Sequence, residues 1–247
     1  LCPLFSMGAG SFRGDNYEIY WYYGVINRVN LGVSMAIIAG NWKMNLSNEE
    51  AIALAKSITA VVDACSNIEV FICPAFPYLG DVVSLIPNAT VCAQNISQYS
   101  SGAYTGDVSA EMVKSIGAKA TLLGHSERRH VFNESNESLK TKLLNCIEHN
   151  LVPILCVGET LEERESNRVF EVIDQQLAIL EEYSSAHMIA YEPVWAIGTG
   201  EVPSLEEIER HLGPVTSGAK AQMRGDLSIA GGAAGPGSRN SRRSRRR

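Results

Sequence analysis

Residues 120–157 read ATLLGHSERRHVFNESNESLKTKLLNCIEHNLVPILCV, and this segment decides the fold class of the chain. It opens with an apolar run at 120–123, continues with a helical pattern over 136–150 and closes with a second apolar run at 153–157. Continuous apolar runs are typical of strands that are covered on both faces. Two such strands joined by a helix indicate a βαβ unit with parallel strands.

The same alternation extends in both directions from this segment. Further strands are predicted at 36–39, 69–73, 90–93 and 187–191, and further helices at 48–65, 78–85, 110–116, 161–182 and 205–211. The last helix has a capping box, Ser204 with Glu207, and Gly213 and Pro214 end it. Six βα units in series favour a barrel or a doubly wound sheet. Because no glycine-rich nucleotide-binding motif follows the first strand, the nucleotide-binding form of the doubly wound sheet is disfavoured.

The two ends of the chain depart from this alternation. Residues 1–34 contain an aromatic cluster at 17–23 with no helical or alternating period, and we interpret them as a non-native or unstructured extension. Residues 35–230 form the predicted barrel domain, whose pattern is clear to about residue 212 and which has one further candidate strand at 227–230. We interpret the basic residues 231–247 as a disordered or out-of-frame tail; a nucleic-acid or localisation tail is the alternative.

Charge and composition argue against several classes of function. Six of the 21 basic residues lie in 239–247, which leaves 15 basic against 27 acidic residues and a formal charge of −12 elsewhere. Such an acidic body is a poor match for nucleic acid or for a membrane surface. No apolar stretch has the length of a transmembrane helix, and the start has no signal-peptide pattern. The six cysteines show no metal-ligand spacing, so we expect reduced thiols and a cytoplasmic protein.

Polar residues follow several of the predicted strands. Asn41 and Lys43 follow the first strand, His125 and Glu127 the fourth, and Glu192 the sixth. In a parallel barrel these strand ends meet at one mouth, where active sites lie. Proton transfer between the two carbons of a hydroxyketone needs a base, a donor for the developing oxyanion and, for a phosphorylated substrate, a cation. One glutamate, one histidine and one lysine on the same rim supply all three.

Four segments resemble the signature segments of the triosephosphate isomerase family, in that family's order and close to its spacing. They are AGNWKMN at 39–45, LGHSERR at 123–129, CVGE at 156–159 and YEPVWAIGTG at 191–200. Several matches in order are far more specific than one short motif. The resemblance implies a TIM (β/α)8 barrel whose last one to two βα units are missing. It also implies interconversion of dihydroxyacetone phosphate and D-glyceraldehyde 3-phosphate through an enediolate, in glycolysis and gluconeogenesis.

The resemblance assigns a role to each of the central residues. Glu192 is implied as the base that moves the proton between the two carbons, and His125 as a neutral imidazole that hydrogen-bonds the substrate oxygens. Lys43 is implied as the cation that meets the phosphate, with Asn41 as a neighbouring donor. Such a proton transfer requires no metal ion and no organic cofactor, so none is expected.

Other residues are implied to support this group. Glu127 pairs with Lys43, although a surface salt bridge with the adjacent arginines is the alternative. Ser126 opens a turn that follows the histidine, and Cys156 packs behind the base rather than acting as a nucleophile. Residues 193–199 resemble the family's mobile lid, whose closure excludes water and brings the backbone N–H of Gly198 to the phosphate.

Residues 94–106 match the long loop by which members of this family insert into a partner subunit. The match implies a homodimer with Thr105 near the partner's active site, and long irregular loops in compact folds are usually functional or disordered. Two other functions remain open, a different phosphate-binding barrel enzyme and a catalytically impaired fragment that only associates with other subunits. The fragment is considered because Gly231-Gly232-Ala233 lacks the serine that the family's phosphate-binding loop has at this point.

Overall fold

The computed structural model describes residues 11–14, 17–26, 35–64, 68–181, 187–196 and 227–229. Within these ranges the strands form one nine-stranded sheet in which their order follows the chain. β3 to β9 are parallel, each paired with the next, and β1 and β2 are antiparallel to their neighbours. The strands are β1 Ser11–Gly14, β2 Tyr17–Ile26, β3 Met35–Asn41, β4 Ile68–Cys73, β5 Thr90–Ala93, β6 Ala120–Leu123, β7 Val152–Val157, β8 Met188–Tyr191 and β9 Leu227–Ile229.

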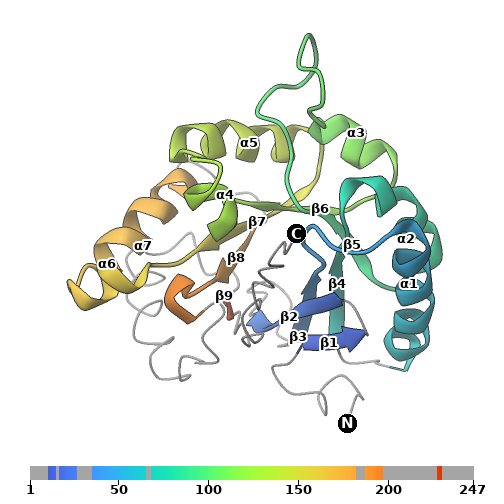
Figure 1. The fold of residues 1–247 in the computed structure, drawn as a ribbon. Helices are drawn as coiled ribbons and strands as arrows, with labels where there is room; N and C mark the ends of the chain where they lie inside the picture. The colour runs from blue at the N-terminus through green and yellow to red at the C-terminus, as the bar shows by residue number, and fades with distance from the viewer. Residues whose placement is uncertain are drawn as a thin grey trace, which may run out of the picture.

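The helices form an arc outside the parallel strands (Figure 1). Ser47 and Thr160 begin α1 and α6 with capping boxes. In each box the side chain of a glutamate three residues on accepts the backbone N–H of the cap residue. The arrangement is a (β/α)8-type barrel with seven parallel strands among the described residues. The helices are α1 Asn48–Asp63, η2 Phe76–Tyr78, α2 Leu79–Leu85, α3 Ala110–Ser115, α4 Ser126–His130, α5 Asn136–Glu148, α6 Leu161–Glu165, α7 Val169–Leu177, η3 Ala178–Leu180 and η4 Val194–Ala196.

The core has two layers, one on each face of the strands. Along β4, Val70 and Ile72 belong to the larger cluster, which also contains the buried helix residues, so this cluster fills the space between strands and helices. Phe71 and Cys73, which alternate with them, belong to a smaller cluster built from strand residues alone. Because successive side chains point to opposite faces of a strand, the smaller cluster is the interior of the barrel.

The sequence predicted most of these elements correctly. The strand bounds at Thr90–Ala93 and Ala120–Leu123 agree, and the other predicted strands lie within two residues of those observed. The prediction of one helix over 161–182 is wrong, because α6, α7 and η3 replace it. Asn167 interrupts the helix with a φ of 54°, a left-handed conformation that an α-helix cannot contain. The predicted helix at 205–211, with its cap at Ser204 and Glu207, and the tail at 231–247 lie outside the described residues.

Two strands lie within residues 1–34, where the sequence indicated no regular period. β1 and β2 form an antiparallel pair, and β2 pairs antiparallel with the whole of β3, from Tyr20 opposite Asn41 to Ile26 opposite Met35. Pairing between strands is a tertiary property, which the local periodicity of one segment does not report. The domain limits at residues 35 and 231 stay predictions.

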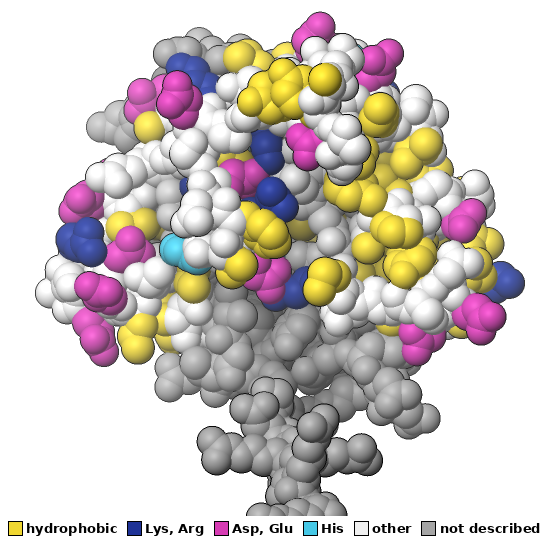
Figure 2. All heavy atoms as spheres, turned by 45° about the horizontal axis from the view of Figure 1, so that its top comes forward, with side chains coloured by type: hydrophobic (Ala, Val, Ile, Leu, Met, Phe, Trp, Pro, Cys, Tyr) yellow, Lys and Arg dark blue, Asp and Glu magenta, His cyan; other side chains and the backbone are white. Residues whose placement is uncertain are grey.

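The segment between β5 and α3 projects beyond the helices (Figure 1). Figure 2 turns this end of the molecule toward the viewer and shows hydrophobic side chains gathered at several places among charged ones. Tyr99, Tyr104, Val131 and Phe132 are among the large hydrophobic residues that are exposed. In the part of the chain that the structure describes, no helix combines the length and the apolar character needed to cross a membrane.

Candidate active site

A cavity of about 320 Å³ lies at the carboxyl ends of the first parallel strands. Residues that follow β3, β5 and β6 line it, together with the turn that carries Phe76 and Pro77. The predicted strand ends therefore meet at one mouth. The polar residues of its lining are Asn41, Lys43, Gln94, Asn95, His125, Glu127 and Arg128.

Glu192 and His125 lie next to each other beside this cavity. The Nε2 atom of His125 is 3.1 Å from Oε1 of Glu192, and both side chains are 4% exposed. The backbone N–H of Ser126 donates to Oε2 of Glu192 at 3.1 Å. The carboxylate is thus held by one donor on each oxygen and is not itself part of the cavity lining.

The hydrogen bonds of His125 determine which of its nitrogens carries the proton. The residue is the N-cap of α4, and its Nδ1 accepts the backbone N–H of Glu127 at 3.3 Å. An accepting Nδ1 holds no proton, so in the neutral ring the proton sits on Nε2, the atom that faces Glu192. The imidazole can therefore present an N–H to a substrate oxygen while staying uncharged.

Lys43 is held in an unusual backbone conformation at the edge of the cavity. Its φ is 51°, which costs a non-glycine residue of order 1–3 kcal/mol. Its backbone N–H donates to Oδ1 of Asn41 at 2.9 Å, and the Gln94 amide donates to its carbonyl at 2.9 Å. The Nζ atom donates to Oε1 of Glu127 at 2.7 Å. The predicted pairing of Glu127 with Lys43 is present in this geometry, and a surface pair with the arginines is not needed to explain the glutamate.

Two residues at the end of β7 lie behind Glu192. Burial raises the pKa of the Cys156 thiol, and the neighbouring carboxylate of Glu192 raises it further. A thiol that stays protonated is a poor nucleophile, in keeping with packing as its role. Gly158 leaves no room for a side chain, because a Cβ built there would collide with the carbonyl of Glu192.

Glu159 is a buried carboxylate in the CVGE segment, and its role was not predicted from the sequence. Both of its oxygens accept from the Tyr191 hydroxyl, at 3.0 and 2.9 Å, and Oε1 also accepts from Trp195 Nε1 at 2.8 Å. Arg164 donates to it at 3.3 Å and stacks over the Trp195 ring. The network anchors the start of the lid segment to the end of β7. The feature of the sequence that could have indicated this role is a glutamate two residues after the end of a buried strand.

Gly198 and Thr105 are the two remaining predicted residues. Gly198 is outside the described residues. Thr105 is exposed in the projecting loop, whose base is fixed by Ser97 bonding to Asp107 at 2.6 Å. Within the loop, the rings of Tyr99 and Tyr104 stack with centroids 3.7 Å apart. The loop therefore has internal order and presents its tip away from the cavity.

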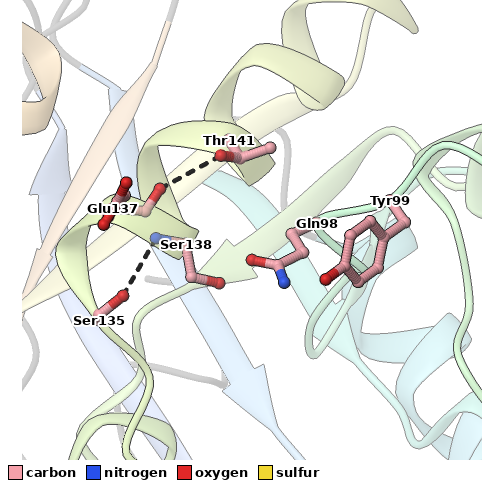
Figure 3. Close-up of a pocket in the computed structure, with 6 residues that line it drawn as sticks. All are labelled: Gln98, Tyr99, Ser135, Glu137, Ser138 and Thr141. Atoms are coloured by element: carbon pink, nitrogen blue, oxygen red, sulfur yellow. Dashed lines mark hydrogen bonds between the residues drawn. The ribbon is translucent and has the colours of Figure 1, made fainter.

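A second cavity of similar size lies at the start of α5 (Figure 3). Its bonds, from Ser138 N–H to Ser135 Oγ and from the Thr141 hydroxyl to the Glu137 carbonyl, belong to the helix cap and to the helix itself. It contains none of the predicted site residues. A search of the described residues finds no group of three or more histidine, cysteine or acidic side chains arranged to hold a metal ion.

The structure combines a (β/α)8-type barrel with a polar cavity at the strand ends and a buried carboxylate–imidazole pair, an arrangement found in isomerases of the (β/α)8 class. The model of the triosephosphate isomerase family matches residues 36–238. Triosephosphate isomerases of Psychromonas ingrahamii and Bacteroides fragilis are 44% and 49% identical over 180 and 175 residues. These alignments cover 70% and 68% of this chain, and 72% and 70% of the two relatives. The chain belongs to the triosephosphate isomerase family.

Proposed function

We propose that this chain interconverts dihydroxyacetone phosphate and D-glyceraldehyde 3-phosphate in glycolysis and gluconeogenesis. The observation that carries the proposal is the 3.1 Å approach of His125 Nε2 to Glu192 Oε1 beside the cavity that Lys43 lines. Membership of the triosephosphate isomerase family supports the same reaction. The alternative of a fragment that only associates with other subunits is not favoured by these findings.

In the proposed mechanism the substrate takes the place of Glu192 at the imidazole. A carbonyl oxygen of the substrate accepts the Nε2–H of His125, which frees the carboxylate to reach the neighbouring carbon. Glu192 removes the proton from C1 of dihydroxyacetone phosphate, and the electron pair of that C–H bond forms the enediolate. Glu192 then returns the proton to C2 while the O1 hydroxyl proton moves to the O2 oxyanion, which yields the aldehyde and the C2 hydroxyl with atoms and charge balanced. His125 stabilises the negative oxygen throughout.

Lys43 contributes the positive charge that the dianionic phosphate requires. Its ion pair with Glu127 and its strained backbone keep the ammonium group at the cavity instead of in open solvent. Asn41 fixes the backbone of Lys43 and offers its own amide to the substrate. Closure of the lid would add the Gly198 N–H and exclude water, because solvent access favours loss of phosphate from an enediolate.

The direct test is the Glu192→Asp variant, assayed with triose phosphates in both directions. Aspartate keeps the charge but withdraws the carboxylate by one methylene, and a misplacement of about 1 Å costs on the order of 100-fold in turnover. The substrate dissociation constant should change little. Glu165→Asp, an exposed carboxylate on α6, is the matched control and should keep full turnover. If Glu192→Asp turns over at the control rate, Glu192 is not the base.

We further propose a cytoplasmic homodimer formed through residues 94–106. The exposed aromatic rings of Tyr99 and Tyr104 support burial of this loop against a partner, and the buried free thiols Cys73, Cys92, Cys146 and Cys156 fit a reducing compartment. Sedimentation of the full chain should give a dimer that Thr105→Arg weakens, since a bulky charge would be buried in the interface. A monomeric parent chain, or a dimer that Thr105→Arg does not affect, would refute this arrangement.

A further inference from the structure

The edge of β3 is occupied by a strand from the beginning of the chain. Seven strands, β3 to β9, are parallel within the described ranges, whereas a closed barrel of this class has eight. All seven residues of β3 pair with residues 20–26 of β2, and β2 also contacts β9. β2 therefore lies between the first and the last of the parallel strands (Figure 1).

We propose that β2, Tyr17–Ile26, closes the barrel of this chain in the position of an eighth strand. The open edges of β3 and β9 form the docking site, and the occupant is a segment of the same chain. An unpaired strand edge presents a row of N–H and C=O groups that pair readily with other chains. An antiparallel strand satisfies these groups as well as a parallel one does.

The position of β1 supports this assignment. β1 pairs with β2 only along Tyr17–Tyr20, which leaves residues 21–26 of that edge unpaired with β1. β9 contacts β2, and it pairs with β8 on its other side, from Leu227 opposite Ile189 to Ile229 opposite Tyr191. The two edges of β2 thus have separate neighbours, as a strand inside a closed barrel must have.

The direction of β2 gives the closure a consequence for the active site. Because β2 is antiparallel, its beginning lies at the mouth of the barrel, where Tyr20 is opposite Asn41. Asn41 in turn holds the backbone N–H of Lys43. Pairing with β2 therefore fixes the strand end from which both residues leave the sheet, and β2 acts as a positioning element for them. This consequence, unlike the closure itself, rests on the proposed function.

The register can be tested with a disulfide in the full chain. Val25 and Ala36 are opposite each other, and directly opposed residues have Cα atoms about 4.5–5.5 Å apart, which a disulfide can span. We expect Val25→Cys with Ala36→Cys to form an intramolecular cross-link on mild oxidation, identified by peptide mass mapping because the chain has native cysteines. Tyr23→Cys with Ala36→Cys is two residues out of register and should cross-link at least tenfold more slowly.

The cross-linking results distinguish the proposed register from other registers, and a strand of the same chain from a strand of a second copy. Equal cross-linking in the two pairs, or none in either, overturns the proposed register. A cross-link found only between two chains shows that a second copy supplies the strand and also overturns the proposal. As a second measurement, Gly24→Pro should increase amide hydrogen exchange throughout β3, because proline removes a donor and disrupts the pairing. Unchanged exchange would contradict closure by β2. None of these measurements uses isomerase activity, so they are independent of the proposed function.

Discussion

At the scale of single residues, the side chains of Glu192 and His125, the proposed base and electrophile, are each other's partners in the structure. Glu192 accepts from the imidazole and from the backbone N–H of Ser126, and both donors come from the turn after β6. Charged groups buried without such partners would cost several kcal/mol. The same contacts hold His125 Nε2 and Glu192 Oε1 3.1 Å apart, so in the proposed mechanism the carboxylate leaves the imidazole when a substrate oxygen takes its place.

The first prediction concerns the imidazole. His125→Gln keeps a hydrogen-bond donor but loses the ring fixed by the Glu127 N–H, so the oxyanion is stabilised less well. Turnover should fall by about 100-fold or more, with a much smaller change in KM, because the lost interaction strengthens in the transition state. Steady-state kinetics with His130→Gln, an exposed histidine on the adjacent α4, provides the control. A raised KM with unchanged turnover would instead assign His125 to substrate binding.

A second residue-scale prediction concerns pH. Burial raises the pKa of Cys146 from 9.0 to about 12. Above pH 9 the thiol ionises in the unfolded chain but stays protonated in the folded one, so its contribution to stability is complete below pH 9 and declines toward pH 12. Urea unfolding at pH 8 and pH 10 should show that the loss of stability between them is smaller in Cys146→Ala than in the parent chain. An identical loss in both would show that this thiol is not the cause.

At the scale of elements, the ends of β7 and β8 determine where the base stands. Glu192 donates its backbone N–H to the Val157 carbonyl at 2.7 Å, and Gly158 bonds to the Gln176 side chain through both its N–H and its carbonyl. These contacts leave the two strand ends in close backbone contact at Gly158. Close approach, and not a positive φ, requires a glycine at 158, because among the described glycines a positive φ occurs at 102, 106, 117 and 124.

The corresponding prediction is that Gly158→Ala damages both stability and catalysis. The added methyl group would collide with the Glu192 carbonyl and push the end of β8 away, which moves the base. We expect a lower melting temperature and a turnover reduced by at least about tenfold. Gly80→Ala on α2 is the control, because a Cβ there meets no atom within 4 Å, and alanine favours the helix by roughly 1 kcal/mol. Normal turnover in Gly158→Ala would show that the strand ends can separate without cost.

The sequence predicted those elements whose cause is local. The strand Ala120–Leu123 follows from an apolar run, and α1 follows from the helical pattern that predicted a helix over 48–65. The approach of His125 to Glu192 joins residues 67 positions apart and was expected only through the resemblance to a family. The roles of Glu159 and of β2 were not predicted, because they depend on tertiary contacts, of Glu159 with Trp195 and of β2 with β3 and β9.

At the scale of the whole molecule, the alternation of predicted strands and helices is clear only to about residue 212. The arrangement of strands explains how the proposed site residues can still be brought together. The sequence after Ile229 contains no further strand pattern, and an open barrel would expose the edges of β3 and β9. In the proposed closure, β2 covers the edge of β3 with backbone pairing and lies against β9. It supplies no glycine-rich phosphate loop of the kind that follows the last strands of phosphate-binding barrels.

The last prediction is that β2 and a parallel eighth strand compete for the same edge of β3. Residues 213–247 can be replaced with a segment that carries the seventh and eighth parallel strands and the phosphate loop of a complete phosphate-binding (β/α)8 barrel. We expect the eighth strand to displace β2 from β3, so that the Val25→Cys, Ala36→Cys cross-link forms in the parent chain but not in the replacement. The KM for triose phosphates should also fall by several powers of ten, since each regained charge-assisted hydrogen bond contributes roughly 1.5–3 kcal/mol. A cross-link that persists with an unchanged KM would show that β2 and the eighth strand do not share one position.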